Sequence, residues 1–484
     1  MNYKMVFYTI GYILIIMSAL LLLPLIISFI CADGVWLSYI WTMLMCLLPG
    51  VGLAFIKPKT KSISAREGII IVGLSWVIMT LLGAFPFFLS NAIPNFAEAL
   101  FESASGFSTT GSTILKVIEV LPKSVLFYRS YIQWIGGIGI LLFVLTILPN
   151  AAASTLHLMR AESTGPQVGK IVSKMKITAR ILYVIYFVLT VVQTILLLCG
   201  GLGIFDSVVI SFSTISTGGL SVKNLSIETY QSVYVTIITG LFMFLSSINF
   251  AVFYLIIIGQ FRKAFKDEEL RWFVAIFVLA VLIIAIDIKG MYATFGDALL
   301  QSFFQVASIF SCCGFSTTNF AVWPVFSQTL LMVLMFIGGC AGSTAGGFKT
   351  IRFATLTKAT FRKSRNYISP RDVSVVKING KMVENDTLSS IWMFFVAYVA
   401  ILVFGALLLA LVDGFDMVTN FTSMLACMSN AGPGLSLVGP YGNFSIFSNF
   451  SKTFLSCIML VGRLEIFPIL MLFSSKTWRI RSFR

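Results

Sequence analysis

The chain alternates long apolar runs with short polar segments. Ten of the apolar runs lie near the length of about twenty residues that a helix needs to cross a bilayer. These runs predict an all-α polytopic membrane protein with ten spans, which places both ends of the chain on the same side. The runs cover residues 5–30, 36–56, 69–88, 126–148, 177–200, 233–258, 272–288, 327–347, 389–412 and 447–473.

Four short stretches centred on glycine interrupt this pattern. Each follows a helical pattern too short to cross a bilayer, and each precedes a long apolar run. Irregular backbone at membrane depth is tolerated only where it is buried in protein or lines a water-filled path. We therefore predict that the four stretches form the walls of one pore. They are Thr109-Thr110-Gly111-Ser112, Ser216-Thr217-Gly218-Gly219, Cys312-Cys313-Gly314-Phe315 and Asn430-Ala431-Gly432-Pro433.

The last eight apolar runs form four pairs, and each pair encloses one short helix and one glycine stretch. The short helices are predicted at 96–108, 204–215, 296–311 and 416–429. The repeating unit is therefore span, short helix, glycine stretch, span, and all four units run in the same direction. Parallel units around a common axis suit a pore better than the inverted repeats of many transporters. We expect an N-terminal helix pair at 1–56, then units at 57–150, 151–262, 263–370 and 371–484.

An acidic residue lies near the start of each short helix, where it suits the positive end of the helix dipole. The negative ends then point toward the glycine stretches, where a cation would be stabilised. Simple helix capping explains the same acids, and both readings can hold. The acids are Glu98, Asp206, Asp297 and Asp416.

Backbone carbonyls are the expected ion ligands in the glycine stretches. A dehydrated monovalent cation needs several oxygens at close range to replace its water shell, and glycine permits the backbone conformations that supply them. For any one stretch, close helix packing explains a small residue equally well. Four stretches at matching positions favour a ring of ligands instead. The predicted ring residues are Thr110, Gly111, Thr217, Gly218, Cys313, Gly314, Ala431 and Gly432.

Composition and charge support this picture. Of the 484 residues, 58% are hydrophobic and 11% are charged, whereas soluble domains average about 25% charged. The net charge of +15 would also suit nucleic acid, but the basic residues cluster in segments that alternate with the spans as the positive-inside rule predicts. They are orientation signals first and contacts for lipid or a partner second. We expect both termini in the cytoplasm and no nucleic-acid partner.

Metal or redox chemistry finds little support. The eight cysteines lie in or beside apolar runs without Cys-x-x-Cys spacing, and His157 is the only histidine. We expect reduced, packed thiols, no covalently bound cofactor and no enzymatic activity, since no paired acidic motif, histidine cluster or nucleophile elbow occurs.

Several longer motifs resemble a known family. The chain is similar over nearly its whole length to the membrane subunits of bacterial Trk potassium uptake systems, the TrkH and TrkG proteins of the TrkH/KtrB/HKT superfamily. The most specific motifs span residues 101–112 (FESASGFSTTGS), 126–130 (LFYRS), 133–137 (QWIGG), 336–347 (FIGGCAGSTAGG), 430–434 (NAGPG) and 462–465 (GRLE).

The resemblance implies four K-channel-like units around a potassium-conducting pore, so that the ion in the ring is K⁺. It further implies a homodimer in the bacterial inner membrane and a cytoplasmic, nucleotide-binding TrkA-type ring as regulator. Each unit offers one glycine where strong potassium channels offer a longer Thr-Val-Gly-Tyr-Gly run. We therefore expect Rb⁺ to be accepted and Na⁺ to be rejected only weakly.

A second glycine-rich segment and a buried arginine are the predicted gate. The segment 338–347 cannot form a stable helix interior, since each glycine costs about 1 kcal/mol relative to alanine. An arginine deep within a span is a functional candidate by default. We expect Arg463 to contact the segment below the ring, with Glu465 compensating its charge or pairing elsewhere. The resemblance implies a gate made of Gly338, Gly339, Gly342, Gly346, Gly347 and Arg463. We expect the other three second spans to lack a comparable break.

Two alternatives and one departure from the family remain open. A proton- or sodium-coupled potassium symporter is the main alternative, with Glu465 as its best candidate carboxylate. The KdpA subunit of a potassium pump is a rival of the same class, but it lacks the first two spans. Cys312 and Cys313 stand where threonine or alanine is commoner in the family. A thiol beside the ring could make the pore sensitive to oxidation or soft metals.

Overall fold

Long apolar runs form long helices, and polar caps mark where the shorter ones begin. The computed structural model describes residues 2–58, 64–139, 175–368, 375–474 and 478. The N-terminal part contains α1 (Tyr3–Leu20), α2 (Leu22–Cys31), α3 (Trp36–Ala54), α4 (Ala65–Gly83), α5 (Phe85–Leu89), α6 (Phe96–Phe107) and α7 (Lys123–Ile138). The middle part contains α10 (Met175–Cys199), α11 (Ile204–Ile215), η1 (Ser226–Tyr230), α12 (Val233–Ser246), α13 (Phe250–Ile257), α14 (Phe261–Phe265), α15 (Glu268–Ile288) and η2 (Lys289–Met291).

The C-terminal part adds one small hairpin to the helices. Strands β1 (Lys377–Ile378) and β2 (Lys381–Met382) pair antiparallel. The helices are α16 (Phe295–Phe310), η3 (Phe320–Val322), α17 (Val325–Ile337), α18 (Thr350–Ile368), α19 (Asn385–Asp413), α20 (Met417–Ser429), η4 (Ser436–Val438), η5 (Phe444–Ile446), α21 (Asn449–Arg463) and α22 (Phe467–Leu472). The predicted helical membrane fold is confirmed.

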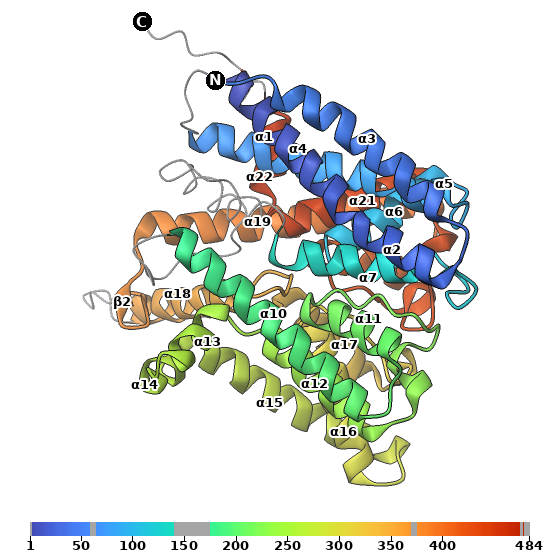
Figure 1. Ribbon diagram of the computed structural model, residues 1–484. Helices are drawn as coiled ribbons and strands as arrows, with labels where there is room; N and C mark the ends of the chain where they lie inside the picture. The colour runs from blue at the N-terminus through green and yellow to red at the C-terminus, as the bar shows by residue number, and fades with distance from the viewer. Residues whose placement is uncertain (1, 59–63, 140–174, 369–374, 475–477, 479–484) are drawn as a thin grey trace, which may run out of the picture.

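The four units have the same order of elements. In each, a long helix (α4, α10, α15 or α19) leads to a short helix (α6, α11, α16 or α20), a glycine stretch and a further helix. The short helices agree with the predicted ranges to within one residue. In Figure 1 the first and last parts of the chain lie together, with α22 beside α4, while α10–α16 form the opposite half. The hydroxyl of Tyr3 donates to the carbonyl of Trp478 over 2.6 Å, so residues near the two ends lie on one side.

Ten spans were expected, but among the described residues six helices are long and apolar enough to cross a membrane, or seven if one bent pair counts as a span. These six are the N-terminal pair and the first span of each unit. Among the described residues, the second spans of the second, third and fourth units are shorter or broken. Helices α12 and α13 meet at a bend of 94°, α17 ends at Ile337, and α21 ends at Arg463. The predicted run 126–148 extends past α7 into residues outside the described ranges.

The expectation of a break in the third unit alone is therefore wrong. In the second unit, the sequence between α12 and α13 contains no glycine. In the fourth unit, the non-glycine residues Glu465 and Ile466 take positive φ angles of 56° and 65°. Non-glycine residues resist this conformation, so tertiary contacts must hold it in place.

Candidate functional site

All four short helices end in the same way. The N–H five residues beyond a helical carbonyl donates back to it, as in a Schellman motif, and the residue just before that N–H is left-handed. The donor and acceptor pairs are Thr110 to Ser105, Gly218 to Ser213, Cys313 to Ser308 and Ala431 to Ala426, with distances of 2.9, 2.8, 2.9 and 2.9 Å. The left-handed residues are Thr109, Thr217, Cys312 and Asn430.

This shared geometry corrects the predicted register of the second stretch. The residue after each donor is a glycine with positive φ, and the four are Gly111 (84°), Gly219 (69°), Gly314 (93°) and Gly432 (87°). The structure thus places Gly218 and Gly219 at the positions of Thr110 and Gly111. The sequence prediction had placed Thr217 and Gly218 there, one residue too early. The dipeptide Gly218-Gly219 offers two candidate glycines, and only the backbone angles choose between them.

The four stretches meet in a closed ring. A methyl group added to Gly111 would lie 2.2 Å from the carbonyl oxygen of Gly218 in the second stretch. A methyl group added to Gly219 would lie 1.9 Å from the carbonyl oxygen of Cys313 in the third stretch. One added to Gly314 would lie 2.6 Å from that of Ala431 in the fourth stretch, and one added to Gly432 would lie 3.1 Å from that of Thr110 in the first. Four segments far apart in sequence therefore present consecutive carbonyls around one axis, with no room for a side chain at the glycines.

A pocket of about 70 Å³ opens on one side of this ring. All four ring glycines line it, together with polar residues that follow them, such as Ser112, Ser221 and Ser316. Helices α6, α11, α16 and α20 lead directly into the four stretches, so their C-terminal ends lie next to the ring. Because those ends carry the partial negative charge of the helix dipole, the ring lies in a potential that favours a cation.

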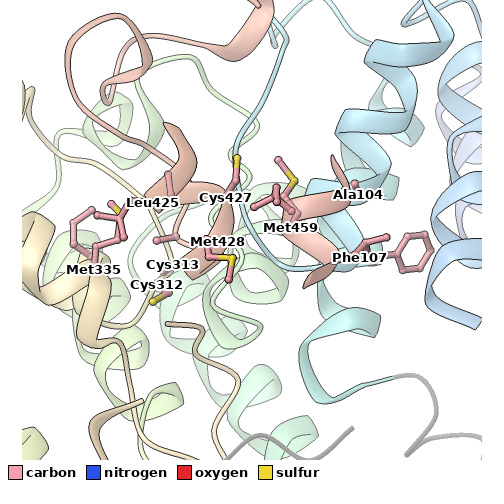
Figure 2. Close-up of a cluster of buried hydrophobic side chains, with 14 of the residues drawn as sticks. Ala104, Phe107, Cys312, Cys313, Met335, Leu425, Cys427, Met428 and Met459 are labelled. Atoms are coloured by element: carbon pink, nitrogen blue, oxygen red, sulfur yellow. The ribbon is translucent and has the colours of Figure 1, made fainter. Parts of the chain in front are cut away.

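Hydrogen bonds between the units hold the ring together. The Ser112 hydroxyl of the first unit donates to the carbonyl of Gly432 over 2.8 Å. The Asn430 amide of the fourth unit donates to the Thr110 hydroxyl over 2.9 Å and to the Met459 carbonyl over 2.9 Å. Figure 2 shows the apolar surroundings, in which Cys312 and Cys313 lie beside Leu425 and Met428 of α20. The ring is thus supported by hydrogen bonds between units and by apolar side chains packed around it.

The glycine-rich segment 338–347 forms an irregular loop beside the ends of α11 and α20. The Thr344 hydroxyl lies 3.0 Å from the carbonyl of Ile215, the last residue of α11. A methyl group on Gly346 would lie 2.0 Å from the carbonyl of Ser429, the last residue of α20. The loop therefore lies on the opposite side of the ring from the pocket.

The broken second span of the second unit and this loop form backbone hydrogen bonds with each other. The Cys340 N–H donates to the carbonyl of Ser247 over 2.9 Å, and the Phe250 N–H donates to the carbonyl of Gly342 over 3.1 Å. The bend between α12 and α13 frees these groups from helical partners. Because unpaired backbone groups are costly away from water, the two breaks stabilise one another.

Arg463 joins the loop to the first unit. Its guanidinium donates to the carbonyl of Thr344 over 2.9 Å and to the carbonyl of Gly136 over 2.6 Å, and it also contacts the carbonyl of Gly137. The expected contact between Arg463 and the loop is confirmed. Glu465 instead pairs with Arg352 of α18. We call the loop 338–347, Arg463 and the carbonyls of Gly136 and Gly137 the loop layer.

Comparison with known proteins shows which family has this architecture. A family model for TrkH, described as a cation transport protein, matches residues 39–480. The chain belongs to the TrkH family of cation transport proteins. The Trk system potassium uptake protein TrkH of Salmonella typhimurium is 35% identical over 99% of this chain and 100% of the relative. TrkG of Escherichia coli is 30% identical over 97% of each.

A solved structure shares the fold of this chain. The crystal structure of the potassium transporter TrkH from Vibrio parahaemolyticus superposes with a TM-score of 0.89 at 32% identity, and the match covers 99% of this chain and 100% of that one. The predicted resemblance is therefore confirmed. The chain is a multi-span membrane protein of a transporter family, which is not a family of enzymes.

Two groups near the ring of this TrkH-family chain were not singled out from the sequence. Arg129 and Glu102 form an ion pair of 2.7 Å that is almost fully buried, and Arg129 also donates to the carbonyl of Ser221 over 3.0 Å. This pair links the first stretch to the second. Glu269 at the start of α15 accepts from the Ala341 N–H over 2.6 Å and anchors the loop. Glu102 and Arg129 lie within the motifs 101–112 and 126–130, but the sequence gave no signal that would have assigned these partners.

Proposed function

We propose that this chain carries K⁺ through the ring of four glycine stretches, into the cytoplasm across the bacterial inner membrane. The observation that carries the proposal is the closed ring, in which the carbonyls of Thr110, Gly218, Cys313 and Ala431 meet consecutive glycines. Backbone carbonyls in such a ring replace the hydration shell of a monovalent cation. The names of the relatives, which are potassium uptake proteins, support K⁺ as the ion.

The loop layer acts as the gate in this proposal. It lies at the end of the ring remote from the pocket, and it draws on all four units through Gly136, Ile215, Thr344 and Arg463. A fixed guanidinium on the ion's route raises the barrier to a cation. Opening then requires Thr344 and Arg463 to separate, which the irregular glycine backbone permits.

Ion fluxes in proteoliposomes test this function. Purified protein with a K⁺ gradient should show flux of K⁺ and Rb⁺ that exceeds the flux of Na⁺ under the same gradient. Equal rates for Na⁺ and K⁺ would refute a K⁺-selective ring. Protein-free vesicles measure the leak.

The same vesicles separate a channel from the proton- or sodium-coupled symporter. With the voltage clamped by an ionophore and a proton gradient imposed, a channel brings K⁺ to the voltage-set equilibrium and no further. Accumulation beyond that equilibrium would establish coupling and would replace the channel in this proposal.

A homodimer and a cytoplasmic TrkA-type nucleotide-binding ring complete the proposal. Helix α18 follows the loop directly and carries exposed basic and aromatic residues, including Phe361 and Tyr367, which suit a partner or anionic lipid. A partner bound there could pull on the loop. Charge-reversal of Lys363 should weaken capture of a co-expressed regulatory ring, whereas unchanged capture would place the docking surface elsewhere. Mass measurement in detergent tests the dimer.

A further inference from the structure

The second stretch differs from the other three at the carbonyl position of the ring. Thr110, Cys313 and Ala431 carry side chains there, whereas the second stretch has Gly218. A methyl group added to Gly218 would lie 2.4 Å from the side-chain carbon Cδ of Gln133 and 2.7 Å from each of its two polar atoms. The amide of Gln133, which comes from α7 of the preceding unit, therefore fills the place of the missing side chain.

Gln133 binds the second stretch at two points. Its Nε2 donates to the carbonyl of Gly218 over 2.6 Å, and its Oε1 accepts from the N–H of Leu220 over 3.2 Å. The side chain is fully buried, and the pair of bonds defines which way the amide faces. The two bonds lie on either side of Gly219, the ring glycine whose positive φ would otherwise allow its flanking peptide planes to turn.

We call the two hydrogen bonds between Gln133 and the second stretch the clamp. The other ring carbonyls have no such clamp. In the described part of the chain, no N–H or O–H group donates to the carbonyls of Thr110, Cys313 or Ala431. One ring oxygen of four is thus shared between the ion's route and an amide donor. This asymmetry arises from the hydrogen bond between the Gly218 carbonyl and the Gln133 amide, and the positions of the glycines in the sequence do not predict it.

We propose that Gln133 is a positioning residue that sets ion discrimination in the ring. This role rests on the proposed function and adds to it the residue that sets the selectivity of the ring. The clamp holds the Gly218 oxygen at a fixed distance from the other three, so that a smaller ion cannot draw it inward. Without the clamp, the second stretch relaxes around Na⁺ as readily as around K⁺, and the preference for K⁺ falls.

The first test compares Gln133→Leu with Gln193→Leu by K⁺ and Na⁺ fluxes in proteoliposomes. Gln193 is a second fully buried glutamine, on α10, and neither of its polar side-chain atoms has a hydrogen-bond partner among the described residues, so its replacement controls for the loss of a buried amide. Losing the clamp should lower the K⁺/Na⁺ flux ratio about three- to tenfold, the factor that corresponds to one or two positioned hydrogen bonds. The control should keep the ratio of the unmodified protein. A Gln133→Leu protein that conducts K⁺ with an unchanged ratio would overturn the proposal.

A double substitution keeps the proposal falsifiable if Gln133→Leu fails to fold. Gly218→Ala alone should abolish K⁺ flux, because its methyl group overlaps the Gln133 amide. Combined with Gln133→Ala, the methyl has space, and K⁺ flux should return with reduced discrimination. If the double variant is no better than Gly218→Ala, the amide does not occupy the side-chain position. A protein without substitutions that prefers neither ion would instead refute the proposed function itself.

Discussion

The ring and the loop layer lie next to each other and follow different rules. In the ring, four stretches of different sequence reach nearly the same backbone, with one left-handed residue and one positive-φ glycine each. In the loop layer, the second spans of the second, third and fourth units end in different ways, and a single loop and a single arginine hold the four units together. Repetition suits coordination of an ion by equivalent oxygens. A movable contact needs only one element, so there the units have diverged.

Gly111→Ala should break the ring with the largest effect. The new methyl group would overlap the Gly218 carbonyl, and alanine resists the φ of 84°. Left-handed backbone and overpacking together cost several kcal/mol, so K⁺ flux should fall by about a hundredfold. Flux in proteoliposomes measures it. Gly52→Ala, at a helix position with no atom within 4 Å of the new methyl group, serves as control. Normal flux in Gly111→Ala would mean that the ring is not the ion's route.

Arg463→Ala should open the loop layer while leaving the ring intact. The substitution removes a positive charge and its hydrogen bonds to the carbonyls of Thr344 and Gly136. Charge-assisted bonds are worth about 1.5–3 kcal/mol, which predicts a rise in flux of about tenfold or more without the regulator. The K⁺/Na⁺ ratio should stay the same. Lys452→Met changes a charge at the other end of α21 and should not raise flux. Unchanged or lost flux in folded Arg463→Ala protein would contradict the gate.

Thr344→Val should loosen the same layer by less. The hydroxyl of Thr344 lies 3.0 Å from the carbonyl of Ile215 and 3.2 Å from that of Ser246, while valine keeps the shape of the side chain. Loss of a neutral hydrogen bond predicts a rise in unregulated flux of about two- to tenfold. Thr355→Val removes a local bond within α18 and is the matched control. A flux equal to that of the control would show that this anchor does not restrain the gate.

Cys313→Ala should have the smallest effect. The thiol is buried and faces the carbonyl of Ser213 in the second unit at 3.8 Å, and the fourth unit already has Ala431 at this position. Because the carbonyl of residue 313 is retained, K⁺ flux should change by no more than about two- to threefold, the cost of one weak hydrogen bond. Methanethiosulfonate reagents should also react slowly with so buried a thiol. Rapid block that Cys313→Ala abolishes would show that the thiol is reached from the pore.

The short helices and three of the four ring glycines could be predicted from local pattern. Apolar periodicity, an acid in the first turn and a glycine after the last turn act within a few residues, so Gly111, Gly314 and Gly432 were placed correctly. The second stretch was misplaced by one residue because Gly218 and Gly219 are locally equivalent. The tertiary structure distinguishes them, since Gln133, which lies 85 residues from Gly218 in sequence, donates to the carbonyl of Gly218.

The broken spans could not be read in the same way. The glycine content of the loop at 338–347 predicts a break in the helix. The bend after Ser246 and the turn at Glu465 and Ile466 contain no glycine and give no such signal. At the bend after Ser246 the loop supplies partners for the freed groups, as between Ser247 and Cys340. At the turn, Arg352 of α18 pairs with the side chain of Glu465.

The sequence by itself determined the membrane class, the four units, the short helices and the family, because hydrophobic period and glycine placement are local properties of the chain. Only the tertiary structure decided the order of carbonyls around the ring, the clamp by Gln133 and the contacts of Arg463 with Gly136 and Gly137. Each of these depends on contacts between segments distant in sequence, and the free energy of such a contact exists only once the units have packed together.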